Sequence, residues 1–103
     1  MSYSAEQNRF NRALDAAVRE WPQNLYNVIR LRDPVCPFHL EVCRKSESRG
    51  VEVFKVRVVL GDASDHDVKI CQQYRMSSAF FTKLILTKER GKRGFKYINI
   101  TEK

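Results

Sequence analysis

The chain has 103 residues, of which 43% are hydrophobic and 30% are charged. This length and composition are typical of one globular domain and exclude wholesale disorder, so we expect a single domain over residues 1–103. The 19 Lys and Arg against 12 Asp and Glu give a formal net charge of +7, which favours polyanionic partners such as nucleic acid.

The same sequence argues against a membrane or secreted protein. No apolar run approaches the length of a membrane span, and the first twenty residues lack the apolar centre of a signal peptide. The cysteines Cys36, Cys43 and Cys71 are odd in number, which without a secretion signal favours reduced thiols. We therefore expect a soluble cytoplasmic protein that does not bind membranes.

Residues 4–21 are predicted to form an amphipathic helix. The apolar residues at helical spacing are Phe10, Ala13, Leu14, Ala17, Val18 and Trp21. Ser4 followed by Gln7 fits a capping box, and Pro22 ends the helix because it lacks an N–H. Acidic and basic side chains balance along this segment, so we interpret it as a packing element.

Alternating apolar residues predict strands over residues 25–32, 38–44, 51–60, 67–75 and 95–100. In the third of these strands Val56 and Val58 point one way, while Lys55 and Arg57 point the other way. A polar turn at residues 45–50 and an acidic loop at residues 61–66 separate neighbouring strands. Such short connections favour antiparallel pairing.

Residues 77–89 fit two patterns. Ser77 or Ser78 caps a helix that Gly91 ends, but alternate apolar positions such as Leu84 and Leu86 also fit a strand. We predict the helix and retain the strand as the alternative. The resulting order predicts an α+β fold. An N-terminal helix packs on a curved, mainly antiparallel sheet of about five strands, and a second short helix precedes the last strand. In architecture alone, an OB-like or related open barrel fits this order.

Cations occupy the strand positions that alternate with the apolar ones, so we expect them on the non-core face of one sheet. They are Arg30, Arg32, Lys55, Arg57, Lys69, Arg75 and Lys96. The alternative is an ordinary solvated sheet face, where Lys and Arg are common.

The C-terminal segment places cations next to aromatic residues. Lys88, Arg90, Lys92, Arg93 and Lys96 fall within nine residues, and Phe95 and Tyr97 lie two apart on one predicted strand face. Phosphates need positive charge, and unpaired bases stack on flat rings with about 1–3 kcal/mol each. The alternative is a solvated hairpin turn with both rings in the core.

These patterns predict a small nucleic-acid-binding protein for single-stranded DNA or RNA, with weak sequence preference. The alternative is a protein-interaction or regulatory module, such as an adaptor or inhibitor of an acidic partner protein. Edge pairing or helix packing would also allow a homodimer.

Metal and catalytic sites are not expected. Cys36, His39 and Cys43 suggest zinc, with Cys71 as a fourth ligand, but on one strand His39 and Cys43 would lie about 13 Å apart. The acidic cluster Asp62, Asp65, His66 and Asp67 matches no calcium loop and is typical of a turn. Because no catalytic motif or phosphate-binding glycine loop occurs, we predict no cofactor and no enzymatic activity.

Overall fold

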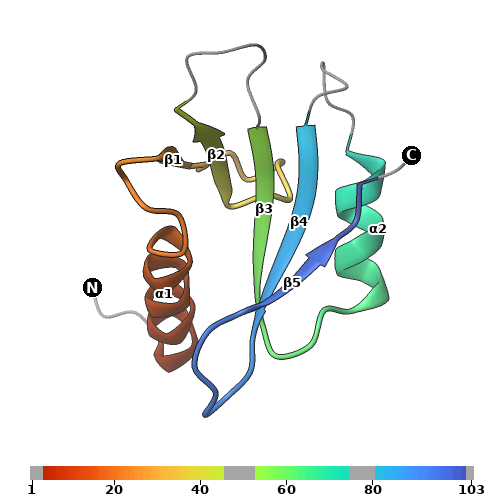
Figure 1. Cartoon of the computed structure of the whole chain (residues 1–103). Helices are drawn as coiled ribbons and strands as arrows, with labels where there is room; N and C mark the ends of the chain where they lie inside the picture. Colours follow the sequence, from red (N-terminus) through yellow and green to blue (C-terminus); the bar gives the residue numbers. More distant parts are fainter. Residues whose placement is uncertain (1–3, 46–52, 75–80, 102–103) are drawn as a thin grey trace.

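The structure is a computed structural model that describes residues 4–45, 53–74 and 81–101. The elements in chain order (Figure 1) are α1 (Ala5–Val18), β1 (Tyr26–Arg30), β2 (Leu40–Arg44), β3 (Val53–Leu60), α2 (Asp65–Gln73), β4 (Phe81–Lys88) and β5 (Lys96–Asn99). Arg75 and most of the predicted turn at residues 45–50 lie outside the described residues. Within these described ranges no helix is long and apolar enough to cross a membrane.

The five strands form one open sheet in the order β1-β2-β3-β4-β5. Three of the pairings are antiparallel, whereas β3 and β4 run parallel. The predicted α+β class, N-terminal helix and mainly antiparallel five-stranded sheet are confirmed. The OB-like barrel is wrong, because the sheet does not close and β1 and β5 remain its edges.

The predicted helix α1 is confirmed, with small changes at its ends. Ser4 Oγ accepts a hydrogen bond from Gln7 N at 3.1 Å, so Ser4 is the N-cap. The Gln7 side chain donates to Asn11 Oδ1 at 3.1 Å. The helix ends at Val18, and Trp21 is buried beyond it.

The strand predicted over residues 67–75 is wrong, because residues 67–73 belong to helix α2. Ser64 begins the helix with a capping box: its Oγ accepts from Asp67 N at 3.1 Å, and Asp67 Oδ2 accepts from Ser64 N at 2.9 Å. Two parallel strands need a crossover, and α2 forms it between β3 and β4. The prediction placed the second helix directly before the last strand, but α2 precedes β4.

The helix predicted over residues 77–89 is also wrong, because residues 81–88 form strand β4. Residues 77–80 of this prediction lie outside the described residues. Strand β4 pairs with β3 on one side and β5 on the other, and both of its faces are covered. Leu84 and Leu86 pack on the α1 side, while Ile85 packs on the α2 side. A strand buried on both faces loses its alternation, so its apolar residues also fit a helical stripe.

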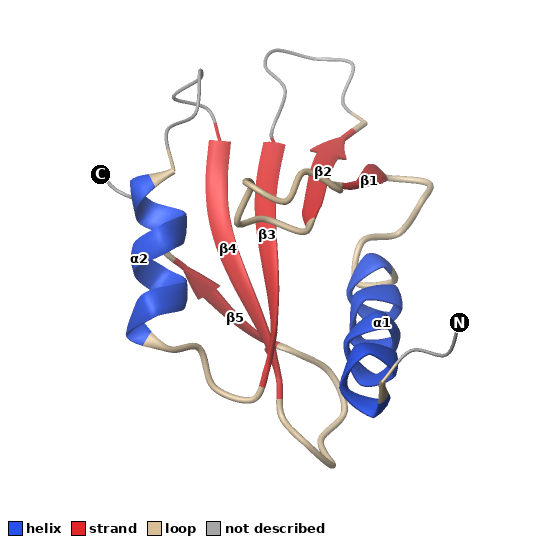
Figure 2. Ribbon diagram, turned by 180° about the vertical axis from the view of Figure 1, so that it is seen from behind, coloured by secondary structure: helices blue, strands red, loops and turns tan. Residues whose placement is uncertain are grey.

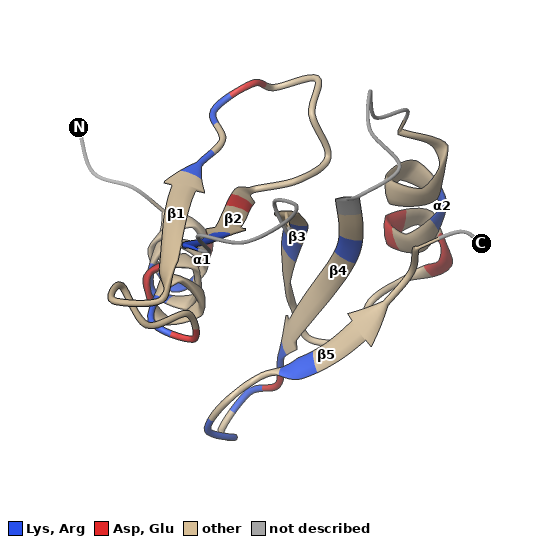
Figure 3. Cartoon of the chain, turned by 45° about the horizontal axis from the view of Figure 1, so that its top comes forward, with Lys and Arg blue, Asp and Glu red and all other residues tan. Residues whose placement is uncertain are grey.

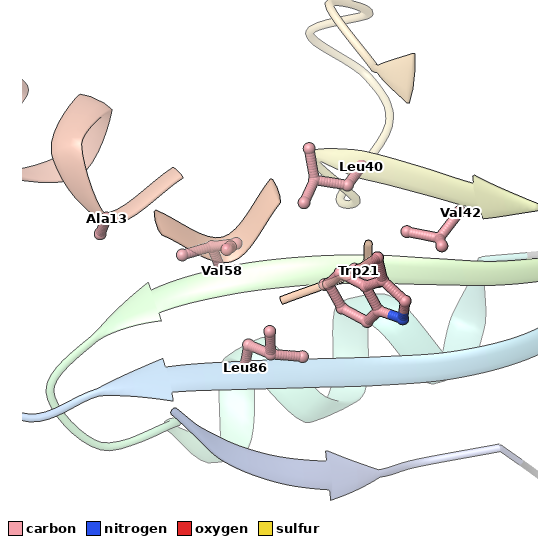
Figure 4. Close-up of a cluster of buried hydrophobic side chains, with 8 residues drawn as sticks. Ala13, Trp21, Leu40, Val42, Val58 and Leu86 are labelled. Atoms are coloured by element: carbon pink, nitrogen blue, oxygen red, sulfur yellow. The ribbon is translucent and has the colours of Figure 1, made fainter. Parts of the chain in front are cut away.

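The core consists of two clusters on opposite faces of the sheet. Helix α1 covers the first cluster, which includes Trp21, Leu40, Val42 and Val58 (Figure 4). Helix α2 covers the second cluster, whose buried members are Phe38, Cys71, Ile85 and Ile100. Figure 2 shows the two helices on either side of the strands.

Two cations on the sheet face that α2 covers bond to the two ends of this helix. Arg57 Nε lies 3.0 Å from Asp67 Oδ1 in its first turn, and Arg57 Nη1 donates to Pro37 O at 2.8 Å. Lys83, only 8% exposed, donates from Nζ to Gln72 O at 3.0 Å and Tyr74 O at 2.9 Å. These carbonyls end the helix, where a positive charge complements the helix dipole.

His39 is a half-buried hydrogen-bond acceptor directly before β2. Its Nδ1 accepts from Val58 N at 2.9 Å, and its ring lies edge-on to Phe10 with centroids 4.9 Å apart. Burial, with a smaller effect of the Arg57 charge, lowers the pKa of His39 to about 4, against an opposing effect of Asp67. The imidazole is therefore neutral in the fold at pH 7.

The first prediction concerns pH. Because the pKa of His39 is lower in the folded chain than in the unfolded one, the unfolded state binds more protons below pH 6.5. The contribution of the neutral His39 to stability is fully present above that pH and declines as the pH falls towards about 4. The free energy of unfolding should fall by about 1 kcal/mol between pH 6.5 and 5, measured by urea denaturation. The same slope in His39→Asn would contradict this assignment, whereas His66→Asn should keep it.

The second prediction concerns the tie between Arg57 and α2. Arg57→Met leaves Asp67 and the Pro37 carbonyl without their donor, so the free energy of unfolding should fall by about 2 kcal/mol. Lys69→Met on the exposed side of α2 should change it by less than about 0.5 kcal/mol. Equal effects of the two substitutions in urea denaturation would refute a structural role for Arg57.

Candidate nucleic-acid interface

The cations predicted on the strands do not share one face. Lys55 and Arg57 lie on the α2 side, where Lys55 Nζ is 2.8 Å from Glu41 Oε1 and Arg57 holds α2. Arg30 ends β1 and forms an ion pair with Asp15 of α1. These three cations are committed to contacts within the fold.

The remaining predicted cations lie on different elements. Lys69 is exposed on α2, Arg32 is exposed in the loop after β1, and Lys96 is exposed at the start of β5. The predicted cations that the structure describes therefore do not form a single basic sheet face. The predicted C-terminal cluster, by contrast, stays together: Lys and Arg residues follow one another along the β4–β5 loop (Figure 3).

The Lys88 side chain bonds to two backbone carbonyls of the β4–β5 loop. Its Nζ donates to Lys92 O at 2.6 Å and Gly94 O at 3.4 Å, and lies 5.5 Å from the centroid of the Phe95 ring. Gly91 and Gly94 both have φ of +79°, the left-handed conformation that the loop's turns require. Beyond the adjoining residues, a Cβ at either glycine would meet no atom within 4 Å, so there is open space beside both backbones.

Four further cations of this segment are exposed: Arg90, Lys92, Arg93 and Lys96. Lys92 Nζ pairs with Glu89 Oε2 at 2.8 Å, and the hydrogen bond and charge of Glu89 raise the pKa of Lys92. Glu89 is the one carboxylate among residues 88–96, so the loop keeps a large positive excess.

The two aromatic residues have different environments. Phe95 is half-buried and packs against the α1 cluster. Tyr97 is 49% exposed, with its ring edge-on to Trp21 and its hydroxyl donating to Glu20 Oε1 at 2.7 Å. Burial and this hydrogen bond raise the pKa of Tyr97, so the ring is held in place by a protonated hydroxyl. Phe95 is thus largely a packing residue, whereas Tyr97 offers a surface.

A cleft of about 840 Å³ lies between the start of α1, the end of β3 and the β4–β5 loop. Its charged lining residues are Arg9, Arg12, Lys88 and Arg90, together with Glu6 and Glu89. Its apolar lining residues are Phe10, Ala13, Ala16 and Leu60, of which Leu60 is 39% exposed. The cleft therefore combines an excess of cations with an apolar surface.

The arginines of α1 were missed at the sequence level, because the charges of this helix cancel when they are added together. Arg9 and Arg12 are three residues apart, and residues at this spacing share one side of a helix. That spacing could have identified a basic side. Its position beside the β4–β5 loop depends on the tertiary fold.

The described residues contain no group of three or more His, Cys, Asp or Glu side chains that could hold a metal ion. Of the suspected zinc ligands, His39 uses Nδ1 to accept from Val58 N. Cys71 lies in the α2 cluster, where burial raises the pKa of its thiol to about 11. At neutral pH this cysteine is a protonated packing residue.

The chain matches no protein-family model, no curated protein and no solved structure. Its functional interpretation therefore rests on the geometry of the cleft and the β4–β5 loop.

Proposed function

We propose that this protein binds single-stranded nucleic acid through one surface, the loop–helix surface. Its residues are Arg9, Arg12, Arg90, Lys92, Arg93, Lys96 and Tyr97, with Leu60 in the cleft between them. The supporting observation is that arginines from α1 and from the β4–β5 loop, far apart in sequence, line one cleft that also has apolar walls.

Phosphate binding is supported by the kind of cation present. Arg9, Arg12 and Arg90 carry planar guanidinium groups, which donate two parallel hydrogen bonds to a phosphate. Glu6 and Glu89 reduce the charge of the cleft but leave cations in excess. Because the molecule as a whole carries +7, its field also attracts a polyanion from a distance.

The preference for single strands is supported by exposed apolar surface next to this charge. Leu60 in the cleft is 39% exposed and Tyr97 is 49% exposed, so both can pack against unpaired bases. In a duplex the bases already stack on one another and gain little from such surfaces. Charge and stacking do not distinguish base edges, so we propose weak sequence preference for both DNA and RNA. The proposed activity is binding alone and involves no catalytic step.

An acidic protein partner would use the same cations but would not need the ring of Tyr97. Nucleic acid gains from both phosphate contacts and stacking, whereas a simple polyanion gains from charge only. Poly-glutamate is therefore the probe that separates the two partner classes.

The third prediction concerns the cleft arginines. Arg9→Ala/Arg12→Ala should weaken binding of a fluorescent single-stranded oligonucleotide at least about tenfold, because two phosphate contacts are lost. Arg19→Ala is the matched control, since Arg19 is exposed at the other end of α1 and does not line the cleft. The slope of log affinity against log salt should become less steep by about 0.7 for each phosphate contact removed.

Three outcomes would oppose the proposal. The first is the absence of oligonucleotide binding by the wild-type protein at low salt. The second is an equal loss in the cleft variant and in Arg19→Ala. The third is poly-glutamate binding as tight as that of the oligonucleotide, which would favour the acidic-protein alternative.

The fourth prediction concerns stacking on Tyr97. Tyr97→Ala should weaken single-strand binding by about 5- to 100-fold, which corresponds to the loss of one base–aromatic stack. Tyr97→Phe removes the hydrogen bond to Glu20 but keeps the ring, so affinity should stay within about threefold of wild type. If the two variants bind equally, the aromatic ring is not a binding element. Thermal unfolding of both variants controls for loss of structure.

A further inference from the structure

Strand β1 is an edge of the sheet and pairs only with β2 among the described residues (Figure 3). Lys45 N donates to Leu25 O and Leu31 N donates to His39 O, both at 2.8 Å, so the odd-numbered residues form the hydrogen bonds to β2. The backbone groups of Val28 and Arg30 therefore point away from the sheet. The N–H of Tyr26 donates to Pro22 O at 2.9 Å, but its carbonyl faces the same open edge.

Two large apolar side chains lie along this edge. Leu25 is 49% exposed and Ile29 is 51% exposed, and neither belongs to a core cluster. Ile29 of β1 lies on the face of the sheet that α2 covers further along, at β4, because Tyr26 and Val28 pack on the α1 side. Leu25 lies in the turn directly before β1, where its carbonyl still accepts a hydrogen bond from Lys45 N at 2.8 Å. The strand contains no proline or lysine, the residues with which exposed edges are commonly protected against pairing, and its one charged residue, Arg30, is paired with Asp15.

We propose that β1 pairs with the β1 strand of a second copy of this chain, antiparallel and about a two-fold axis at Asn27. This alignment puts Leu25 opposite Ile29 of the partner copy, and by symmetry Ile29 opposite the partner's Leu25. Both exposed apolar side chains then cover each other at non-hydrogen-bonded positions, where cross-strand side chains are closest. Each Val28 N–H faces the Tyr26 carbonyl of the other copy.

The residues that would face each other across this seam allow a second copy to be the occupant. In this alignment Arg30 lies opposite Asn24, so no two like charges face each other across the seam. Arg30 is also neutralised within its own copy by the ion pair with Asp15. Pairing of the edges would join two sheets into one, the closed two-fold arrangement typical of homodimers.

A matched pair of charge variants tests this interface. Leu25→Lys/Ile29→Lys puts lysine opposite lysine twice, whereas Leu25→Glu/Ile29→Lys puts glutamate opposite lysine twice. Both positions are half exposed and outside the core, so each copy should fold as the wild type does, checked by circular dichroism. Sedimentation equilibrium from micromolar to submillimolar protein should show a wild-type dimer, at least about tenfold weaker association of the Lys/Lys variant, and retained association of the Glu/Lys variant.

Two results would overturn the proposal: a wild-type protein that stays monomeric over the whole range, or equal association of the two variants. Nucleic acid is absent from this experiment, so its outcome does not depend on the proposed function. Added salt also distinguishes dimer formation from nucleic-acid binding. It should strengthen the dimer, because it screens the repulsion between copies that each carry +7, whereas it should weaken nucleic-acid binding.

Discussion

The parallel pairing of β3 and β4 is the constraint on which the rest of the structure depends. Parallel neighbours cannot be joined by a tight turn, so the chain crosses one face of the sheet as α2 and leaves the other face to α1. Strand β4 is thereby buried on both sides, and the chain leaves it at the end of the sheet where α1 begins. The β4–β5 loop therefore lies beside the first turns of α1, and the cleft forms between them.

Sequence patterns predicted the elements whose apolar residues lie mainly on one side. Helix α1 and strand β2 show the periodicity of a single buried face, and β3 keeps that alternation because its second face, although covered, carries Lys55 and Arg57. The patterns failed where that condition does not hold. Strand β4 is covered on both faces, and the short helix α2 has Val68 and Ile70 at spacing that also fits a strand. Ser64 with Asp67 was the one local signal that could have identified the start of α2.

The candidate site was predictable where it is contiguous in sequence. The cations and rings of residues 88–97 stay together because they occupy one loop and the strand that follows it. The strand cations were assigned to an open face, because alternation shows that Lys55 and Arg57 oppose the core residues but cannot show that α2 and its flanking loop cover them. Arg9 and Arg12 join the candidate site only because the start of α1 lies beside the β4–β5 loop in the tertiary fold, which the sequence patterns do not show.

The interior cations Arg57 and Lys83 also fix the alignment of the central strands. In the ladder Lys83 lies beside Lys55, and each amine is satisfied separately, by the carbonyls of α2 and by Glu41. If β4 slipped by one residue, Lys83 would turn towards Trp21 and Val58 on the α1 side of the sheet, where no carbonyl of α2 could accept hydrogen bonds from its amine. Apolar residues on both faces of β4 would tolerate such a slip. The buried amine therefore makes the misaligned sheet costly, and a positive charge specifies a register that hydrophobic burial leaves undetermined.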